Sequence, residues 1–287
     1  MSANKGRPAP ARPRRGNIKG FNVIAYPIAH AVVSAVSRPQ WGGIENFPKS
    51  GPFIVAPNHV SEFDPVSMGY FLGYNGFEPR FLAKDALFKV PVIGLFLRWW
   101  GMIPVARGSN NAGDALVHAR EALAEDAVVT IYFEGTITRD PAFWPMKGKT
   151  GLARLALDTR VPVVPIVQWG AQNVMDRYTT PRLHLRRPNL YIKVLPPIDY
   201  SDIEGDSTNR EGVRELTGRL EEALMEGSAA LRNEDPPEKP WDMKTMDGPG
   251  KGRLKVFSGW RAELARRIKS RDVLPVEPSV TRGRYVR

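Results

Sequence analysis

A histidine and an aspartate five positions apart are the side chains of this sequence best suited to moving a proton. His59 and Asp64 follow the apolar segment Phe53–Pro57. A histidine exchanges protons near neutral pH, and a carboxylate on one ring nitrogen fixes the tautomer so that the other nitrogen can accept a substrate proton. Positions five apart do not share a helix face, so the pair meets only across a turn that enters a helix, and Asp64-Pro65 suits such a helix start. The alternative is that Asp64 caps this helix and that His59 is a structural turn residue.

The composition excludes several kinds of chemistry and favours an anionic partner. The 287 residues include no cysteine, which excludes disulfides, thiolate metal sites and cysteine nucleophiles, and the sequence shows no cluster of metal ligands. The net charge of +11 is concentrated at the ends, since residues 1–19 carry +6 and residues 251–287 carry +8. Two basic ends around a near-neutral middle segment favour an anionic surface as the binding partner. No apolar run reaches the ~20 residues of a spanning helix and no cleavable signal is visible, so we expect a cytosolic or peripheral membrane protein.

The chain divides into four parts. We expect residues 1–16, rich in Pro and Arg, to form a disordered basic arm, and residues 17–40 to form an amphipathic helical segment that Pro27 kinks or splits. This helix either packs on the core or lies at a membrane interface. Residues 41–232 hold the patterns of one domain, and residues 233–287 form a Pro/Gly-rich linker and a basic tail, with a last helix at Phe257–Ile268.

Short apolar strands alternate with helices through residues 41–232. The expected strands are Phe53–Ala56, Arg80–Ala83, Ile103–Ala106, Val128–Phe133, Val163–Gln168 and Leu190–Val194. The expected helices are Pro65–Leu72, Leu87–Trp100, Asn110–Ala124, Gly151–Asp158 and Asn209–Leu231. This alternation predicts an α/β fold with a mostly parallel central sheet flanked by helices.

Three later segments carry residue types that suit a phosphorylated or hydroxyl-bearing substrate. Arg107, in the segment Gly101–Gly108, follows a strand and can offer a planar charged fork to a phosphate. Glu134-Gly135-Thr136 follows another strand, at the strand end where α/β sheets bind ligands, and Gly135 permits close backbone approach. The apolar strand in Val161–Ile166 has two prolines that restrict the backbone at a pocket edge. Taken singly, these features also fit a surface arginine, a turn glycine and a core strand.

Together with Asn58-His59-Val60-Ser61-Glu62-Phe63-Asp64, these segments resemble the four blocks of the glycerolipid acyltransferase family, which includes the lysophosphatidic acid and glycerol-3-phosphate acyltransferases. The resemblance covers about residues 40–200 and implies direct transfer of an acyl group from a thioester to a hydroxyl. It implies that His59 is the base and Asp64 its orienting partner, and that Arg107 binds the acceptor phosphate. It further implies that Glu134, Gly135 and Thr136 line the acceptor site, and Lys84 stands where the family often has a second cation.

The implied reaction needs no cofactor besides the acyl-CoA or acyl carrier protein that brings the acyl group. The expected acceptor is 1-acyl-sn-glycerol-3-phosphate, which would give phosphatidic acid, and the expected location is peripheral, on the anionic cytoplasmic face of the cell membrane. The third block departs from the usual Phe-Pro-Glu-Gly-Thr-Arg, because Phe133 replaces proline and Ile137 replaces arginine. Arg139 and Lys149 are candidates for the missing charge, and glycerol 3-phosphate or a lysophospholipid with a larger headgroup is an alternative acceptor.

Other classes of protein fit the sequence less well. A serine hydrolase needs a Gly-x-Ser-x-Gly elbow, which the sequence lacks, and Ser61 lies too close to His59 to be an elbow serine. A nucleic-acid-binding protein is favoured by charge alone, and the sequence contains no recognised RNA- or DNA-binding motif. A non-catalytic membrane-binding module would not need the histidine and the aspartate together. Trp99 and Trp100 either form an acyl groove or a membrane-facing ridge, or pack in the core.

Overall fold

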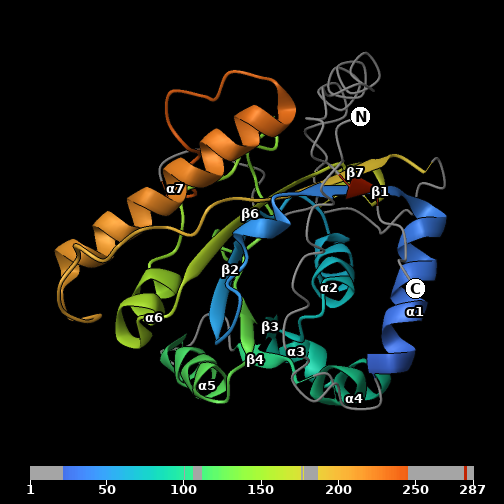
Figure 1. Cartoon of the computed structure of the whole chain (residues 1–287), viewed down its shortest axis with the longest axis horizontal. Coiled ribbons are helices and arrows are strands. Elements are labelled where there is room, and N and C mark those ends of the chain that lie inside the picture. The colour runs from blue at the N-terminus through green and yellow to red at the C-terminus, as the bar shows by residue number, and fades with distance from the viewer. Residues whose placement is uncertain are drawn as a thin grey trace, which may run out of the picture.

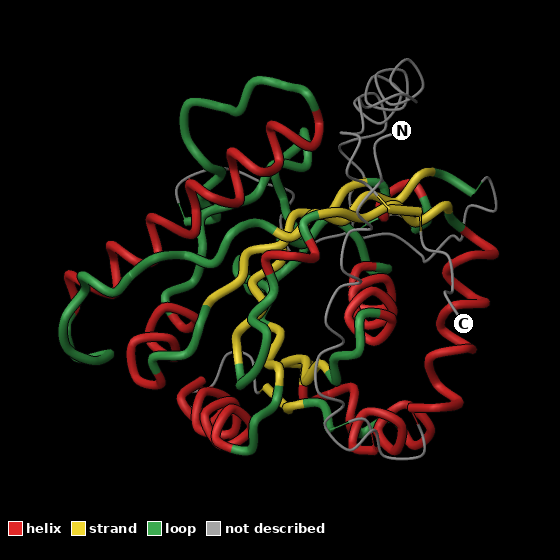
Figure 2. The backbone as a smooth tube through the Cα atoms, viewed as in Figure 1, coloured by secondary structure: helices red, strands yellow, loops and turns green. Residues whose placement is uncertain are grey.

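The structure, a computed structural model, describes residues 22–99, 101–105, 112–175, 177, 187–244 and 281–282, which build a sheet with helices on both faces (Figures 1 and 2). The helices are α1 Asn22–Val36, α2 Asp64–Tyr74, α3 Asp85–Phe88, α4 Pro91–Trp99, α5 Ala112–Ala124, α6 Gly151–Thr159 and α7 Arg210–Arg232, with 3-10 turns at Ile44–Asn46 and Ala171–Asn173. The strands are β1 Arg38–Gly42, β2 Phe53–Pro57, β3 Pro79–Lys84, β4 Ile103–Val105, β5 Val128–Thr130, β6 Val163–Trp169, β7 Asn189–Val194 and β8 Thr281–Arg282. The predicted α/β fold is confirmed.

The sheet has the strand order β4-β3-β5-β2-β6-β7-β1-β8. All neighbours from β4 to β6 run parallel, β7 runs antiparallel to β6, and the two-residue β8 runs antiparallel to β1. The parallel strands β2 and β5 therefore end at the same edge of the sheet. The chain leaves β2 toward His59 and leaves β5 toward Glu134 at this edge, which is where parallel sheets place their ligand sites.

Each face of the sheet has its own layer of helices, as Figure 1 shows. Helices α5, α6 and α7 pack on one face, while α1 and α2 pack on the other. Strand β2 shows how the sequence serves both layers, because Phe53 and Val55 join one core cluster and Ile54 and Ala56 join the other. Alternate side chains of a strand point to opposite faces, so a fully apolar strand belongs between two layers.

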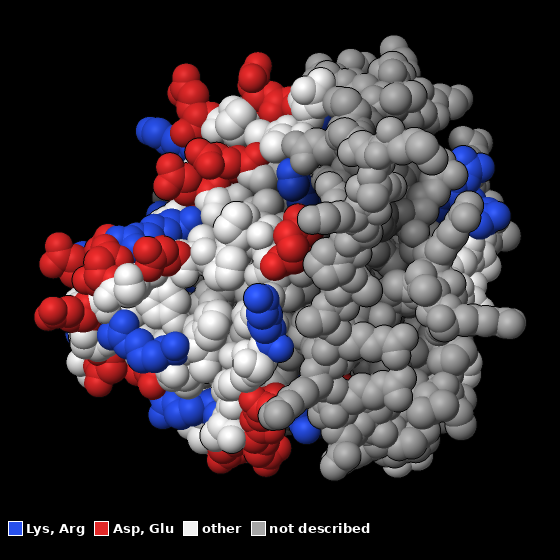
Figure 3. Space-filling model, viewed as in Figure 1, with Lys and Arg blue, Asp and Glu red and all other residues white. Residues whose placement is uncertain are grey.

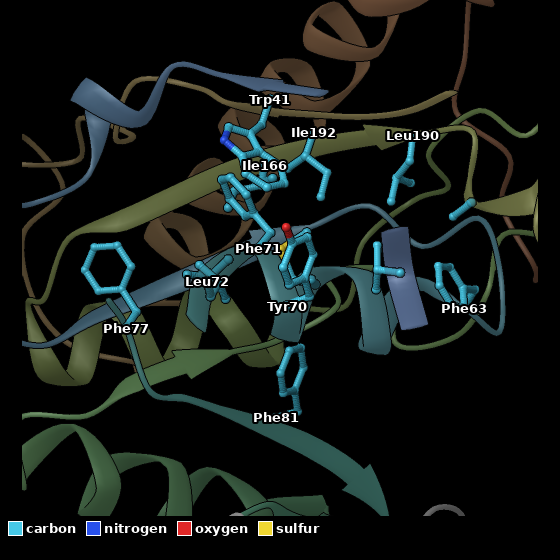
Figure 4. Packing of buried hydrophobic residues seen from close by; sticks show 14 of the residues in the cluster. Trp41, Phe63, Tyr70, Phe71, Leu72, Phe77, Phe81, Ile166, Leu190 and Ile192 are labelled. Carbon is cyan, nitrogen blue, oxygen red and sulfur yellow. The ribbon is translucent and has the colours of Figure 1, made fainter. Parts of the chain in front are cut away.

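The core under α2 is rich in aromatic side chains, several of which are drawn in Figure 4. Trp41 of β1 lies 5.4 Å from Phe71 between ring centroids, and Phe77 lies 4.7 Å from Phe47. Such tilted ring pairs add roughly 0.5–1.5 kcal/mol each beyond the area that they bury. They fix α2, and with it Asp64 at the start of the helix, against the sheet.

The structure corrects several predicted boundaries. The helix expected at Leu87–Trp100 is two helices, α3 and α4, because Pro91 cannot continue the first and begins the second. The strand expected at Val128–Phe133 ends at Thr130. Helix α1 is assigned without a break through Pro27, so the expected split is wrong. The arm 1–16 and the helix Phe257–Ile268 lie outside the described residues.

Two segments outside the predicted domain limits take part in the fold. Strand β1 starts at Arg38 and pairs with β7, so the sheet begins before residue 41. After α7, Trp241 forms a bridge with Met146, and its carbonyl accepts a hydrogen bond from the Lys147 backbone N–H at 2.9 Å. Part of the segment expected as a linker is therefore docked beside the third block.

Two features of the described residues concern the predicted membrane association: the distribution of surface charge and the length of the apolar helices. In the region of α6 and α7, Figure 3 shows acidic and basic side chains intermingled, with no broad patch of one sign. Within the described helices, none combines the length and the apolar content that a membrane crossing requires.

Candidate active site

His59 and Asp64 are in direct contact at the carboxyl end of β2. The chain turns after Pro57, and Asp64 is the first residue of α2, so the two side chains meet across the turn as the sequence predicted. The Nδ1 atom of His59 lies 2.7 Å from Oδ2 of Asp64. The imidazole is 12% exposed, while the carboxylate is fully buried. With the Nδ1 proton donated to the aspartate, Nε2 is left as the nitrogen that can take a substrate proton.

Backbone groups of the same turn hold Asp64 in place. Its Oδ2 atom accepts hydrogen bonds from the backbone N–H groups of Val60 at 2.5 Å and Ser61 at 2.8 Å. Burial raises the pKa of Asp64 above its ordinary value, and His59 with the two N–H groups opposes that rise. Phe63 occupies the N-cap position and no side chain caps the helix there. The carboxylate thus serves the histidine and its turn, and the alternative that it caps α2 is wrong.

Ser61 has a structural role, because its hydroxyl group bonds to the backbone on both sides. Its Oγ atom donates to the Met175 carbonyl oxygen at 2.6 Å and accepts the Phe63 N–H at 3.0 Å. Both directions of its hydrogen bonding are therefore occupied by backbone groups. This arrangement agrees with the exclusion of Ser61 as a hydrolase nucleophile.

A glutamine that the sequence analysis did not single out locks the start of the turn. Gln168 of β6 donates from its backbone N–H to Asn58 Oδ1 at 2.8 Å and from Nε2 to the Asn58 carbonyl oxygen at 2.9 Å, while Asn58 Nδ2 donates to the Gln168 carbonyl oxygen at 3.2 Å. Ser67 of α2 lies 3.4 Å from Gln168 Oε1. The only sequence signal was one amide in an otherwise apolar strand, two residues after the fourth block.

Glu134 connects the third block to the first. Its Oε1 atom accepts the backbone N–H of His59 at 2.9 Å, and its Oε2 atom accepts the backbone N–H of Met146 at 3.0 Å. The side chain is fully buried, and burial raises the pKa of Glu134 from 4.5 to about 8, with nearby Asp64 adding to the rise and the two N–H groups opposing it. Both oxygens are engaged inside the protein, where they fix the backbone that carries the histidine. The predicted contact of Glu134 with the acceptor stays a prediction.

The turn after Glu134 is built by a glycine and faces solvent. Gly135 has φ +70°, a left-handed conformation that suits glycine, and a Cβ at this position would lie 3.1 Å from Cγ of Lys149. Lys149 is exposed, whereas Ile137, which replaces the arginine of the third block, is buried. Of the two cations considered for the missing charge, the structure places Lys149 against the Gly135 turn.

The structure describes the other predicted substrate-binding residues only in part. Thr136 follows Gly135 and is half-buried. Lys84 is the last residue of β3, and its side chain lies outside the described part, as does all of Arg107. Their roles stay predictions. Within the described residues, no three His, Asp or Glu side chains come together in a way that would hold a metal ion.

Comparison with known proteins agrees with this geometry. Residues 38–169 match the family described as Acyltransferase. A chloroplast 1-acyl-sn-glycerol-3-phosphate acyltransferase of Brassica napus is 33% identical over 135 residues, which are 46% of this chain and 38% of that protein. The human 1-acyl-sn-glycerol-3-phosphate acyltransferase alpha is 27% identical over 197 residues, 67% of this chain and 66% of that protein. This chain thus spans between about two fifths and two thirds of the length of these relatives.

A solved structure shows the same fold. The crystal structure of the 1-acyl-sn-glycerophosphate acyltransferase PlsC from Thermotoga maritima superposes with a TM-score of 0.57 and 24% identity, over 72% of this chain and 80% of that one. The family match covers β1 to β6 and includes His59, Asp64 and Glu134. The part of the chain that carries the site is thus similar to the Acyltransferase family.

Proposed function

We propose that the protein transfers a fatty acyl group from an acyl thioester to the free hydroxyl of 1-acyl-sn-glycerol 3-phosphate, which yields phosphatidic acid. The observation that carries the proposal is the contact between His59 Nδ1 and the buried Asp64 carboxylate at 2.7 Å, at the end of β2. The relatives named above, described as 1-acyl-sn-glycerol-3-phosphate acyltransferases, support the choice of acceptor.

In this reaction His59 works as a general base. Nε2 takes the proton of the acceptor hydroxyl while the oxygen attacks the thioester carbonyl, so that a C–O bond forms and the C–S bond breaks. The imidazolium then returns its proton to the departing thiolate. Asp64 stabilises the imidazolium and keeps the tautomer, and general-base catalysis of this kind contributes about 10²–10⁴-fold.

The acceptor phosphate would be held by cations at the same sheet edge. Lys149 lies against the exposed Gly135 turn, next to the Glu134 that binds the His59 backbone. Arg107 and Lys84 would add charge from the second block and from the end of β3. Because Ile137 is buried where the family block has arginine, an acceptor with a larger headgroup is the second candidate.

We further propose that the enzyme works as a peripheral protein at the anionic cytoplasmic face of the cell membrane. Six of the seven most exposed large apolar side chains among the described residues lie on α1 to α4 or in the α3–α4 connection: Ile28, Val32, Val66, Leu87, Val90 and Leu95. Apolar side chains exposed on helices suit insertion into a lipid interface. The donor is an acyl thioester, carried by coenzyme A or by acyl carrier protein.

An acylation assay tests the proposal. The purified protein is incubated with a labelled acyl thioester and with 1-acyl-sn-glycerol 3-phosphate, glycerol 3-phosphate or lysophospholipids of larger headgroup. We expect transfer to the first acceptor, and loss of about 10²–10⁴-fold in His59→Ala. His118→Ala is the matched control, because His118 is exposed on α5, where its ring pairs with Glu121 of the same helix. Near-normal turnover by folded His59→Ala would refute the mechanism.

A further inference from the structure

The tyrosine at the first position of the third block, Tyr132, lies flat against the imidazole of His59. The two ring centroids are 4.0 Å apart and the rings are inclined by only 22°. Tyr132 follows the end of β5 and stands two residues before Glu134. We propose that Tyr132 is a positioning residue of the acyl transfer reaction, whose ring holds the imidazole in its working orientation and stabilises the positive charge that forms on it. This inference rests on the proposed function.

The contact with Asp64 cannot fix the imidazole by itself. A single hydrogen bond from Nδ1 to Oδ2 leaves the ring free to pivot about that bond, and a pivot would move Nε2 away from the acceptor hydroxyl. A second planar ring stacked on the imidazole face opposes this rotation. With the backbone N–H held by Glu134, His59 is fixed at its main chain, at Nδ1 and across one ring face.

The aromatic ring also has an electrostatic effect that an aliphatic side chain would lack. The face of an aromatic ring carries partial negative charge and attracts a cation placed over it. The imidazole is neutral before the reaction and positive once it has taken the hydroxyl proton, so the attraction grows toward the transition state. An interaction that strengthens in this way raises kcat and leaves substrate binding unchanged.

Tyr132 itself stays neutral and does not compete as a base. Burial raises the pKa of Tyr132 well above 10, and the Asp64 carboxylate adds to this rise. The ring, rather than the phenol group, is therefore the part of Tyr132 that acts on His59. Replacement by phenylalanine should keep this function, and replacement by leucine should remove it.

Simple core packing is the competing explanation, because Tyr132 also packs against the large apolar cluster. The experiment separates the two by measuring kcat and the KM of each substrate in Tyr132→Phe and Tyr132→Leu. Phe77→Leu is the matched control, since Phe77 is a buried ring of the same cluster that makes tilted and edge-on contacts with other phenylalanines. Thermal unfolding checks that each variant is folded.

We expect Tyr132→Leu to lose about 10- to 100-fold in kcat with both KM values within about twofold, as for a misplaced catalytic group. Tyr132→Phe should keep kcat within about threefold, and Phe77→Leu should keep kcat once it is folded. Equal kcat in Tyr132→Leu and the unmodified protein would overturn the proposal. So would an equal loss in Tyr132→Phe and Tyr132→Leu.

A spectroscopic measurement tests the contact without activity. The sequence has four histidines, so the ring-proton signals of His59 can be identified by their loss in His59→Ala. The stacked ring should shift these signals upfield in the unmodified protein and in Tyr132→Phe, and the shift should vanish in Tyr132→Leu; signals that do not move would overturn the proposal. If the protein transfers acyl groups and Tyr132→Leu is fully active, only this inference fails, whereas absence of any acyl transfer would overturn the proposed function as well.

Discussion

Replacing Glu134 by glutamine should change how the stability of the protein depends on pH. The carboxyl group is fully buried and accepts the backbone N–H groups of His59 and Met146. Burial raises the pKa of Glu134 to about 8 in the folded protein, from 4.5. Between these two values the folded chain keeps a proton that the unfolded chain has released. The free energy of unfolding therefore falls as pH rises through this window and levels off above it.

The size of the effect follows from the width of the window. Each pH unit between the two pKa values costs about 1.4 kcal/mol, so the Glu134 contribution to the free energy of unfolding should fall by about 4 kcal/mol from pH 5 to pH 8. A glutamine does not titrate, but its Nε2 cannot accept either backbone N–H. Leaving one buried donor without an acceptor costs about 1–3 kcal/mol. Glu134→Gln should thus be the less stable protein at pH 5, and the difference should close or reverse by pH 8.

Urea unfolding of Glu134→Gln and of the unmodified protein between pH 5 and pH 9 measures this difference, because groups remote from Glu134 titrate alike in the two chains. Glu222→Gln, at an exposed position of α7, is the matched control for the loss of one carboxylate. A difference between Glu134→Gln and the unmodified protein that stays constant within about 1 kcal/mol over this range would refute the role of burial at Glu134.

The remaining predictions concern the acceptor and the membrane. Lys149→Ala should raise the acceptor KM about tenfold, because one charged contact with the acceptor is lost, and it should leave the thioester KM unchanged. The control Lys147→Ala should change neither KM. A change in the thioester KM alone would contradict this prediction. Ile28→Ser with Leu95→Ser should weaken sedimentation with anionic vesicles, whereas Val117→Ser on α5 should not; equal binding by all variants would exclude this face.

The central part of the fold could be predicted because its signals are local. Strand β2 is a short apolar run between turns, and the His59–Asp64 contact joins residues only five apart, so both could be inferred from a short stretch of sequence. The break between α3 and α4 also has a local cause in Pro91. Strand β1 has no comparable signal, since Arg38–Gly42 contains a proline and a glycine. It becomes a strand through its pairing with β7, about 150 residues later.

The support of the site depended on contacts that the sequence does not show. Gln168 and Asn58 are 110 residues apart, and Glu134 and His59 are 75 residues apart. Glu134 could be placed at a strand end, where a substrate-facing carboxylate was expected. Its burial depends on two segments that pack against it, the turn after β2 with the His59 N–H and the later segment with the Met146 N–H, so it is a property of the assembled edge.

Two departures in the third block, at Phe133 and Ile137, are changes of packing. Phe133, which stands in the place of proline, is buried, and its ring fills the space that a Cβ at Gly148 would need, at 1.9 Å. Ile137, which stands in the place of arginine, is also buried. Neither replacement disturbs the bonds from Glu134 to the His59 and Met146 backbones. The base and its support can thus be kept while the charge next to the Gly135 turn comes from Lys149. A change at Phe133 or Ile137 should therefore alter which acceptor is bound before it alters the reaction.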